Sequence, residues 1–184
     1  MVYTQEGDME KIQTEYTVTV SDFRRASYYG LFLRRRRPLQ ILFVVLLAAP
    51  LYGIGASLGL GTANPLVFFI AAAYLVWGLL LFAGTERSIR QYLRTPGNFI
   101  GCTYRATLES HRVQFEVPER GVKAAQQTGS LTCVFELSQL FLIYISVQDL
   151  YILPCRALTE AQRAALRENF RRRLGPRFGS RFRT

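Results

Sequence analysis

A long stretch without ionisable side chains dominates this chain of 184 residues: residues 38–85 contain no Lys, Arg, Asp, Glu or His. One break, around residues 61–65, divides the stretch into two apolar segments, 39–60 and 65–83. As helices they would be about 33 Å and about 28 Å long, and the hydrocarbon core of a bilayer is about 30 Å thick. Each segment is therefore predicted to span a membrane, and the short connection predicts a tight helical hairpin.

A cleaved signal sequence is the alternative for the first segment. A secretory signal has a short basic start and an apolar stretch of about 7 to 15 residues. Here the 38 residues of mixed composition that come first, and the longer apolar stretch, do not fit that pattern. We therefore interpret the segment as a membrane span.

Arginines flank the apolar block on both sides. Arg34, Arg35, Arg36 and Arg37 precede it, and Arg87 and Arg90 follow it. Cytoplasmic loops are enriched in Lys and Arg, so both ends of the hairpin are predicted to be cytoplasmic in a bacterial inner membrane. These arginines are interpreted as a topology anchor whose heads reach lipid phosphates; a specific pocket for an anionic phospholipid head group is the alternative.

Small residues recur along the first apolar segment. One row comprises Ala49, Gly53, Ser57 and Gly61, and a neighbouring pair comprises Gly55 and Gly59. Small residues let helices approach closely in lipid. Two interpretations stay open for them, contacts within the hairpin and formation of a homo-oligomer. Neither segment contains an ionisable residue, so the sequence offers no candidate residues for an ion or proton pathway.

The remaining sequence predicts strands and two helices. Tyr16, Val18 and Val20 alternate with polar residues as in a strand, and Ser21 is expected to cap a helix that enters the bilayer. Residues 104–108 and 112–117 predict a hairpin that turns at residues 109–111, followed by a polar loop. A third strand with Leu131, Cys133, Phe135 and Leu137 on one face, a buried strand at 140–145 and a last strand ending at Pro154 complete one sheet.

The end of the chain predicts a helix that covers the sheet. Thr159 and Gln162 form a capping box, Leu166, Phe170 and Leu174 share a face, and Gly175 with Pro176 stops the helix. Arg171, Arg172 and Arg173 are candidates for contact with anionic lipid; a solvated tail is the alternative. Nucleic acid is a less favoured partner because no recognition motif accompanies the charge.

No residue pattern indicates catalysis, a metal or a cofactor. Cys102, Cys133 and Cys155 are far apart, and His111 is the only histidine. A zinc site needs about four ligands at characteristic spacings, which are absent from the sequence. We expect a protein that is not an enzyme, without catalytic or metal-binding residues.

The order of elements resembles a known family. The chain is expected to contain a strand, a helix, a two-span hairpin and further strands, the last of which ends in YILPCRAL (residues 151–158) before a C-terminal helix. This order is similar to that of the YcxB-like family of small bacterial membrane proteins. The resemblance covers nearly the whole chain. It implies a cytoplasmic domain of pleckstrin-homology-like fold with the hairpin inserted after its first strand, and implies no particular chemistry.

The expected fold is an α+β membrane protein: a two-helix transmembrane hairpin inserted after the first strand of a cytoplasmic antiparallel sheet, which a C-terminal helix caps. Four parts are expected: an N-terminal strand and helix (1–37), the hairpin (38–85), the sheet with the C-terminal helix (86–174) and a basic tail (175–184). The expected function is a binding module for a protein partner of unknown identity or for anionic lipid. An immunity protein that protects the inner membrane from a toxin is the alternative.

Overall fold

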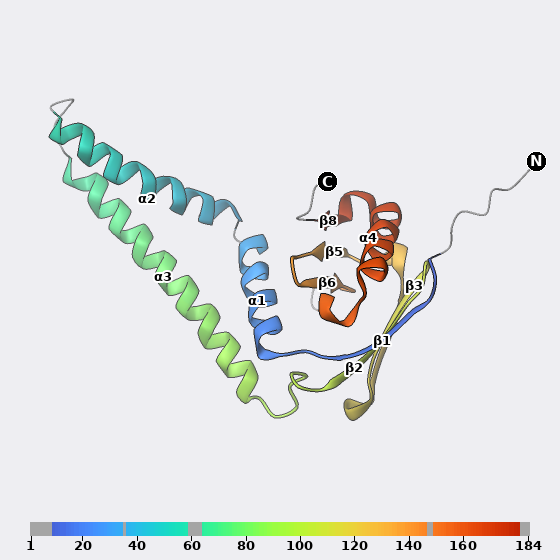
Figure 1. Ribbon diagram of the computed structural model, residues 1–184. Coiled ribbons are helices and arrows are strands. Elements are labelled where there is room, and N and C mark those ends of the chain that lie inside the picture. Colours follow the sequence, from blue (N-terminus) through green and yellow to red (C-terminus); the bar gives the residue numbers. More distant parts are fainter. Residues whose placement is uncertain (1–8, 35, 59–63, 147–148, 181–184) are drawn as a thin grey trace, which may run out of the picture. The chain divides into compact units, whose positions relative to one another are not determined.

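The computed structural model describes residues 9–34, 36–58, 64–146 and 149–180, except for the side chains of residues 33, 34, 36 and 180. The chain forms two compact units. The first comprises Met1–Ala26 and Phe99–Thr184, and the second comprises Ser27–Asn98. The protein is thus an α+β chain in which a helical unit interrupts a unit built mainly of strands (Figure 1).

The helical unit contains the two apolar segments. Its elements are the second half of α1 (Val20–Arg34), α2 (Arg36–Ser57) and α3 (Pro65–Arg94). Asn64 caps α3 because its side chain accepts a hydrogen bond from the N–H of Leu66, and Pro65 occupies the first turn, where a missing N–H costs little. α2 and α3 are both long and apolar enough to cross a membrane.

α3 continues beyond the apolar block, to Arg94. The helical unit as a whole extends to Asn98. The predicted end of the hairpin part at residue 85 concerns the membrane boundary and stays a prediction. Within this unit α1 packs against the middle of α3: the ring centroids of Tyr28 and Phe82 lie 6.0 Å apart, and those of Phe32 and Phe82 lie 6.4 Å apart. Aromatic pairs at such distances stabilise helix contacts beyond the area that they bury.

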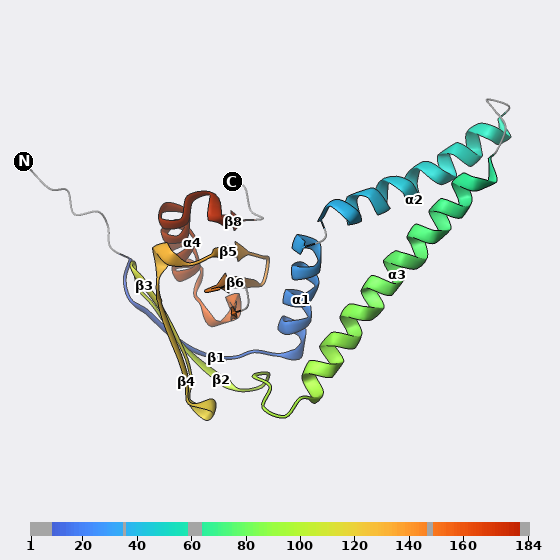
Figure 2. The same cartoon turned by 180° about the vertical axis from the view of Figure 1, so that it is seen from behind.

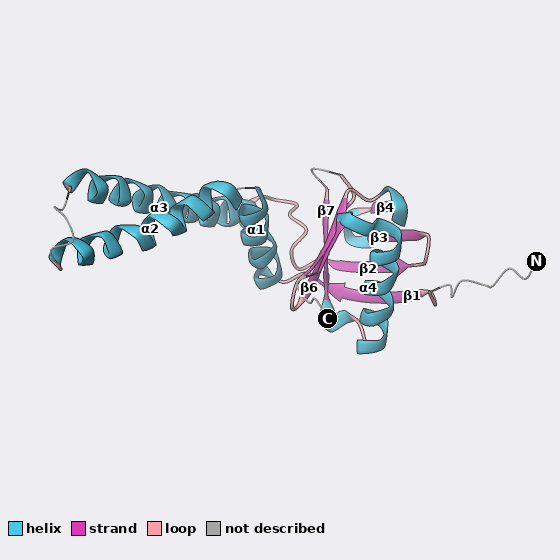
Figure 3. Ribbon diagram, turned by 90° about the horizontal axis from the view of Figure 1, so that it is seen from above, coloured by secondary structure: helices cyan, strands magenta, loops and turns pink. Residues whose placement is uncertain are grey.

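The strand unit contains two four-stranded sheets, visible from behind in Figure 2. The first sheet is antiparallel in the order β1-β2-β3-β4, and its strands are β1 (Ile12–Thr17), β2 (Thr103–Leu108), β3 (Arg112–Val117) and β4 (Val122–Gln127). The second sheet has the order β7-β6-β5-β8, and its strands are β5 (Cys133–Glu136), β6 (Leu140–Tyr144), β7 (Leu150–Pro154) and β8 (Phe178–Ser180). Figure 3 shows the strands of one sheet running across those of the other.

The core of this unit lies between the sheets and under the C-terminal helix. The rings of Phe115 on β3 and Tyr151 on β7 stack with centroids 4.5 Å apart, which joins the two sheets. α4 (Glu160–Leu174) packs on the second sheet through Leu166, Phe170 and Leu174, all buried. Its predicted capping box of Thr159 and Gln162 and its end at Gly175 are confirmed.

Several predictions about the strands are confirmed. β2 and β3 form the expected hairpin, with Leu108 opposite Val113. β6 is buried along most of its length, and β7 ends at Pro154.

Other predictions about the strand unit are wrong. One sheet was expected, but there are two, and the supposed polar loop after residue 121 contains β4. The third strand buries Val134 and Glu136, whereas Cys133 and Phe135 of the predicted inner face are half-buried. β8 lies in the expected basic tail and pairs in parallel with β5. Pairing with partner strands supports β4 and β8, because neither strand has a strong apolar alternation of its own: β4 pairs with the preceding strand β3, and β8 pairs with the distant strand β5.

The junction between β1 and α1 also differs from the expectation. β1 ends at Thr17, and α1 begins at Val20, so Val20 belongs to the helix and Ser21 is not its cap. Thr19 caps the helix instead, since its hydroxyl oxygen accepts a hydrogen bond from the N–H of Asp22 at 3.3 Å. In return, the carboxylate of Asp22 at the third helical position accepts a hydrogen bond from the backbone N–H of Thr19, which completes a capping box.

Candidate functional site

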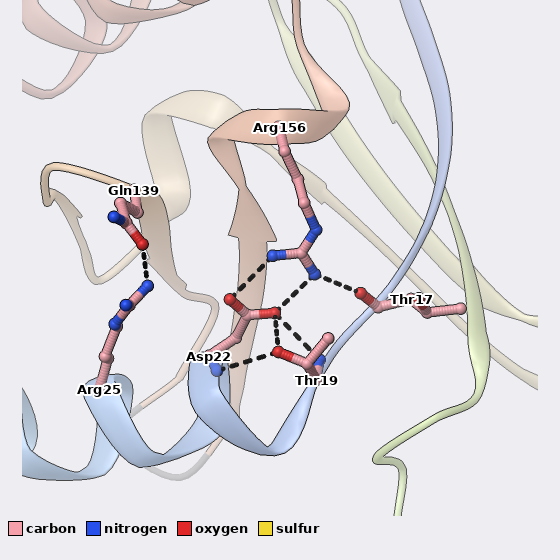
Figure 4. A network of polar contacts seen from close by, with 6 residues as sticks. All are labelled: Thr17, Thr19, Asp22, Arg25, Gln139 and Arg156. Atoms are coloured by element: carbon pink, nitrogen blue, oxygen red, sulfur yellow. Dashed lines mark hydrogen bonds and ion pairs between the residues drawn. The ribbon is translucent and has the colours of Figure 1, made fainter.

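A network of polar side chains surrounds Asp22 at the start of α1 (Figure 4). One carboxylate oxygen of Asp22 accepts hydrogen bonds from the N–H (2.9 Å) and the hydroxyl (2.8 Å) of Thr19. The guanidinium of Arg156 donates to both carboxylate oxygens, at 3.0 Å and 2.6 Å, and also donates to the carbonyl oxygen of Thr17 at 2.8 Å. Asp22 is only 1% exposed, and its charge is therefore matched by bonds from within the strand unit.

The electrostatics of the network favour the ionised carboxylate. Burial raises the pKa of Asp22, but the hydrogen bonds from Arg156 and Thr19 outweigh burial and lower the pKa below its usual value. The hydrogen bond to Asp22 raises the pKa of Arg156 in turn. The pair is thus a bidentate ion pair at neutral pH, the strongest geometry available to these two side chains.

Neighbouring contacts fix the same junction. Arg25 in α1 donates a hydrogen bond to the side-chain oxygen of Gln139 (Figure 4). The hydroxyl of Thr14 on β1 donates to the carbonyl oxygen of Ala157 at 2.7 Å. Ala157 and Arg156 belong to the short 3-10 helix η3 (Cys155–Ala157), which follows β7. The YILPCRAL segment therefore attaches β1 and the first turn of α1 to the second sheet.

A second charged cluster lies under α4. Glu136 on β5 has a side chain with 0% exposure, and Arg167 donates to its two oxygens at 2.7 Å and 2.6 Å. Arg163, one helical turn earlier, donates to the same carboxylate at 3.1 Å. A buried carboxylate without such partners would cost several kcal/mol, so this cluster holds α4 in place on β5.

The arginines that follow the apolar block line a hollow on α3. The hollow has a volume of about 600 Å³ and is lined by Ala83, Glu86, Arg87, Arg90, Gln91 and Arg94. Arg87 and Arg90 are both exposed. The hydroxyl of Tyr28 donates to a carboxylate oxygen of Glu86 at 2.8 Å. The hollow is thus a basic, accessible surface with one carboxylate at its edge.

Of the arginines before the apolar block, the structure describes only the side chain of Arg37, which is exposed. Arg35 and the side chains of Arg34 and Arg36 lie outside the described residues.

The small-residue row faces α3 in part. Ala49 is buried, and a Cβ atom on Gly53 would lie 3.3 Å from the ring of Phe68 on α3. Ser57 is exposed and donates to the carbonyl oxygen of Ile54 at 2.7 Å. A Cβ atom on Gly55 would meet no atom within 4 Å, so this glycine lies on a free face. Gly59 and Gly61 lie outside the described residues.

The three C-terminal arginines occupy different environments. Arg171 lies 3.6 Å from the carboxylate of Glu168, and Arg172 is exposed. Arg173 is half-buried, and its guanidinium contacts the hydroxyl of Ser110 at 3.4 Å and the Nε2 atom of His111 at 3.1 Å. Arg173 therefore has a structural contact with the β2–β3 turn in addition to any role at a lipid surface.

Two of the three cysteines are in surroundings that disfavour a reactive thiolate. Burial raises the pKa of Cys133 and of Cys155, which disfavours the nucleophilic thiolate. In the part of the chain that the structure describes, no disulfide is formed and no group of three or more His, Cys, Asp or Glu side chains is placed to hold a metal ion.

The chain matches no protein-family model, no curated protein and no solved structure. The similarity to the YcxB-like family therefore stays a prediction.

Sequence reasoning missed the roles of Asp22, Glu136 and Arg156. Glu136 stands within an apolar strand (CVFE) and is followed by Arg163 and Arg167 at a spacing of one helical turn. An acidic residue in a strand and two arginines on one helix face form a signal of charge complementarity. Asp22, three residues after Thr19, fits the pattern of a capping box.

Proposed function

We propose that this protein is a non-enzymatic membrane protein of the bacterial inner membrane, anchored by α2 and α3, which presents its strand unit to a protein partner in the cytoplasm. The observation that carries the proposal is the place of insertion. β1 and β2 are neighbours in an antiparallel sheet, and Thr17 pairs with Thr103. The chain thus leaves and re-enters the sheet at adjacent positions, so a hairpin that crosses twice returns both of its ends to one side.

The surfaces of the two apolar helices support an anchor in lipid. Their most apolar windows are only 17% and 11% buried. Leu47, Leu51 and Phe69 are 66%, 67% and 73% exposed. Soluble monomers rarely expose contiguous apolar surface of this kind, and a lipid environment would cover it without any further contact from the chain.

Charge supports the cytoplasmic side for both ends. Arg34–Arg37 precede the first span, and Arg87, Arg90 and Arg94 follow the second, whereas the turn between the spans contains no charged residue. The positive-inside rule then assigns the arginine flanks, and with them the strand unit, to the cytoplasm.

The β4 edge is the surface that we propose for the partner. In the described part of the chain β4 pairs with β3 alone, and none of its six residues is buried. The opposite edge of the sheet, β1, is partly covered by its contact with Ala157. β4 has the sequence VKAAQQ, with one charge and no proline, so nothing in it prevents pairing with an added strand.

The first test is topology. Reporter fusions at each terminus and in the turn between the spans should report a cytoplasmic location for both termini and an external one for the turn. Replacement of Arg34–Arg37 by Gln should increase the inverted fraction, and the same change in Arg112, a residue of the sheet, should not. A periplasmic terminus in the wild-type protein would overturn the proposal.

The second test addresses the partner. Full-length protein is purified in a gentle detergent, and retained proteins are identified by mass spectrometry. Ala124→Pro and Ala125→Pro are then compared, because successive residues of a strand direct their N–H groups to opposite edges. One substitution removes a bond to β3, and the other removes only an outward N–H.

The edge proposal requires that the variant with unchanged stability loses the partner. If that variant retains a stoichiometric partner, the partner binds elsewhere. Recovery of the homo-oligomer alone would mean that the membrane anchor serves self-assembly rather than presentation to another protein.

A further inference from the structure

We propose that the hollow on α3 lined by Arg87, Arg90 and Arg94 binds the phosphate head group of an anionic phospholipid from the cytoplasmic leaflet. This inference rests on the membrane anchoring proposed above and adds a defined site and ligand class to it. The hollow is about 600 Å³ in volume and is open to its surroundings, with its lining on α3 alone.

The spacing of the three arginines places them on one stripe of the helix. Positions 87, 90 and 94 are separated by three and four residues, which brings their side chains above one another on the same face. With Glu86, the described lining carries three positive charges and one negative charge. Guanidinium groups bind phosphate oxygens in a bidentate manner, so this arrangement favours a phosphate ligand over a neutral one.

The position of the hollow along the helix axis matches the head-group layer of the membrane. The apolar part of α3 ends near Ala83, and Arg87 and Arg90 follow about 6 Å and about 10 Å further along the axis. The head-group layer of one leaflet is about 5 to 8 Å thick. Side chains on a helix lean toward its N-terminus, which for α3 is the direction of the bilayer. Arg87 and Arg90 therefore reach back toward the phosphates, and Arg94, about 16 Å beyond Ala83, lies at the outer end of the hollow.

The part of the α3 surface that lies N-terminal to the hollow suits acyl chains. Val76, Leu79 and Leu80 precede Ala83 on the same stripe and are 55%, 61% and 65% exposed. A lipid whose phosphate lies at Arg87 would lay its chains along this apolar face. A soluble phosphate compound would leave it uncovered, and we therefore assign the site to a lipid.

Glu86 does not oppose the assignment. The hydroxyl of Tyr28 donates to its Oε1 atom, which partly satisfies the carboxylate from the α1 side. Ala83 and Gln91 complete the lining: the first is small, and the second offers an amide donor to a phosphate or glycerol oxygen.

The test uses purified full-length protein in a neutral detergent. Binding of phosphatidylglycerol and of phosphatidylcholine is titrated by native mass spectrometry. The variant is the triple substitution Arg87→Gln, Arg90→Gln and Arg94→Gln. The matched control removes the same charge from exposed residues of the strand unit, through Lys11→Gln, Arg112→Gln and Lys123→Gln.

The wild-type protein should prefer phosphatidylglycerol, and the triple variant should lose about tenfold or more of that preference, as expected for three arginines near anionic lipid. The control should keep it. A charge-preserving variant with Lys at the three positions should retain part of it, which separates the loss of binding from a failure to fold.

Three results would overturn the inference: unchanged preference in the triple variant, an equal loss in the control, or displacement of the lipid by inorganic phosphate. The anchoring proposal has its own readout, the resistance of wild-type protein to alkaline extraction from membranes. Extraction would refute the anchor, whereas an integral protein without lipid preference would refute only the head-group site.

Discussion

The Oδ2 atom of Asp22 lies 2.6 Å from the Nη2 atom of Arg156, although 134 residues separate them in the sequence. Asp22 is the third residue of α1, and Arg156 follows the last strand before α4. The ion pair therefore attaches the first turn of α1, the helix that precedes the apolar hairpin, to η3, the 3-10 helix that follows β7. Both residues belong to the strand unit, so a change in this pair would alter the stability of that unit.

Breaking the Asp22–Arg156 pair should destabilise the strand unit. Asp22→Asn should lower the free energy of unfolding by about 1 to 3 kcal/mol, because charge-assisted bonds to a buried group are lost. Arg156→Gln should cost less, since its side chain is 51% exposed. Denaturant unfolding of the full chain in detergent, arranged as a double-mutant cycle, measures the coupling.

The exposed pair of Glu15 and Arg105 provides the control for this cycle. Glu15→Gln should change stability by less than about 1 kcal/mol. Equal effects at Asp22 and Glu15 would show that burial of Asp22 contributes nothing.

The same carboxylate should make stability depend on pH. The pKa of Asp22 is lowered in the folded protein, so its contribution is fully present above the unfolded pKa of about 3.9 and is lost as the pH falls through the folded value. Wild-type protein should therefore lose stability below about pH 4 more steeply than Asp22→Asn. Unfolding curves collected between neutral and strongly acidic pH test this; parallel curves for the two proteins would contradict it.

Removing the charge of Glu136 should be among the most destabilising single changes. Glu136→Gln leaves Arg163 and Arg167 without their buried acceptor and should cost about 3 to 5 kcal/mol. Proteolysis of α4 in the otherwise intact protein is a second readout. Glu168→Gln on the same helix, where the side chain is 67% exposed, should stay within about 0.5 kcal/mol. A similar result for both variants would refute the role of the cluster.

Glycines on two faces of the hairpin should respond differently to enlargement. A Cβ atom on Gly78 would lie 2.8 Å from Leu42, and one on Gly53 would lie 3.3 Å from Phe68, whereas Gly55 has open space. Gly78→Leu and Gly53→Leu should therefore destabilise the α2–α3 contact by about 1 to 3 kcal/mol. A lower midpoint of thermal aggregation in detergent would detect the change.

Gly55→Leu serves as the control in the same measurement. It should leave the hairpin intact. If it instead abolishes cross-linking between copies, the free face of α2 is an interface between protomers. Wild-type behaviour of all three variants would make the small-residue row incidental.

Local signals account for the elements that could be predicted. The β2–β3 hairpin follows from strict alternation on both sides of the turn at residues 109–111, and α4 follows from the Thr159 cap and the stop at Gly175. Each of these signals lies within a few residues of the element that it determines. The cap of α1 was misplaced at Ser21 because the alternation of Val18 and Val20 masked the capping pattern of Thr19 and Asp22.

The remaining elements depend on contacts with other elements rather than on a pattern in their own sequence. β4 is a weak strand by composition and exists through its pairing with β3, from Val117 opposite Val122 to Arg112 opposite Gln127. β8 contains three residues and depends on β5. The burial of Glu136 is favourable only when Arg163 and Arg167 are brought over it by α4.

The sequence by itself determined the two apolar helices, the basic flanks and the C-terminal helix, because hydropathy, charge and capping act over one or two helical turns. The turn predicted between the two apolar helices lies largely outside the described residues. The tertiary structure alone decided that the strands divide into two sheets and that Asp22 and Glu136 find their arginines. Those choices depend on contacts between residues far apart in the chain, where the ordering of backbone and side chains must be offset by burial of several elements at once.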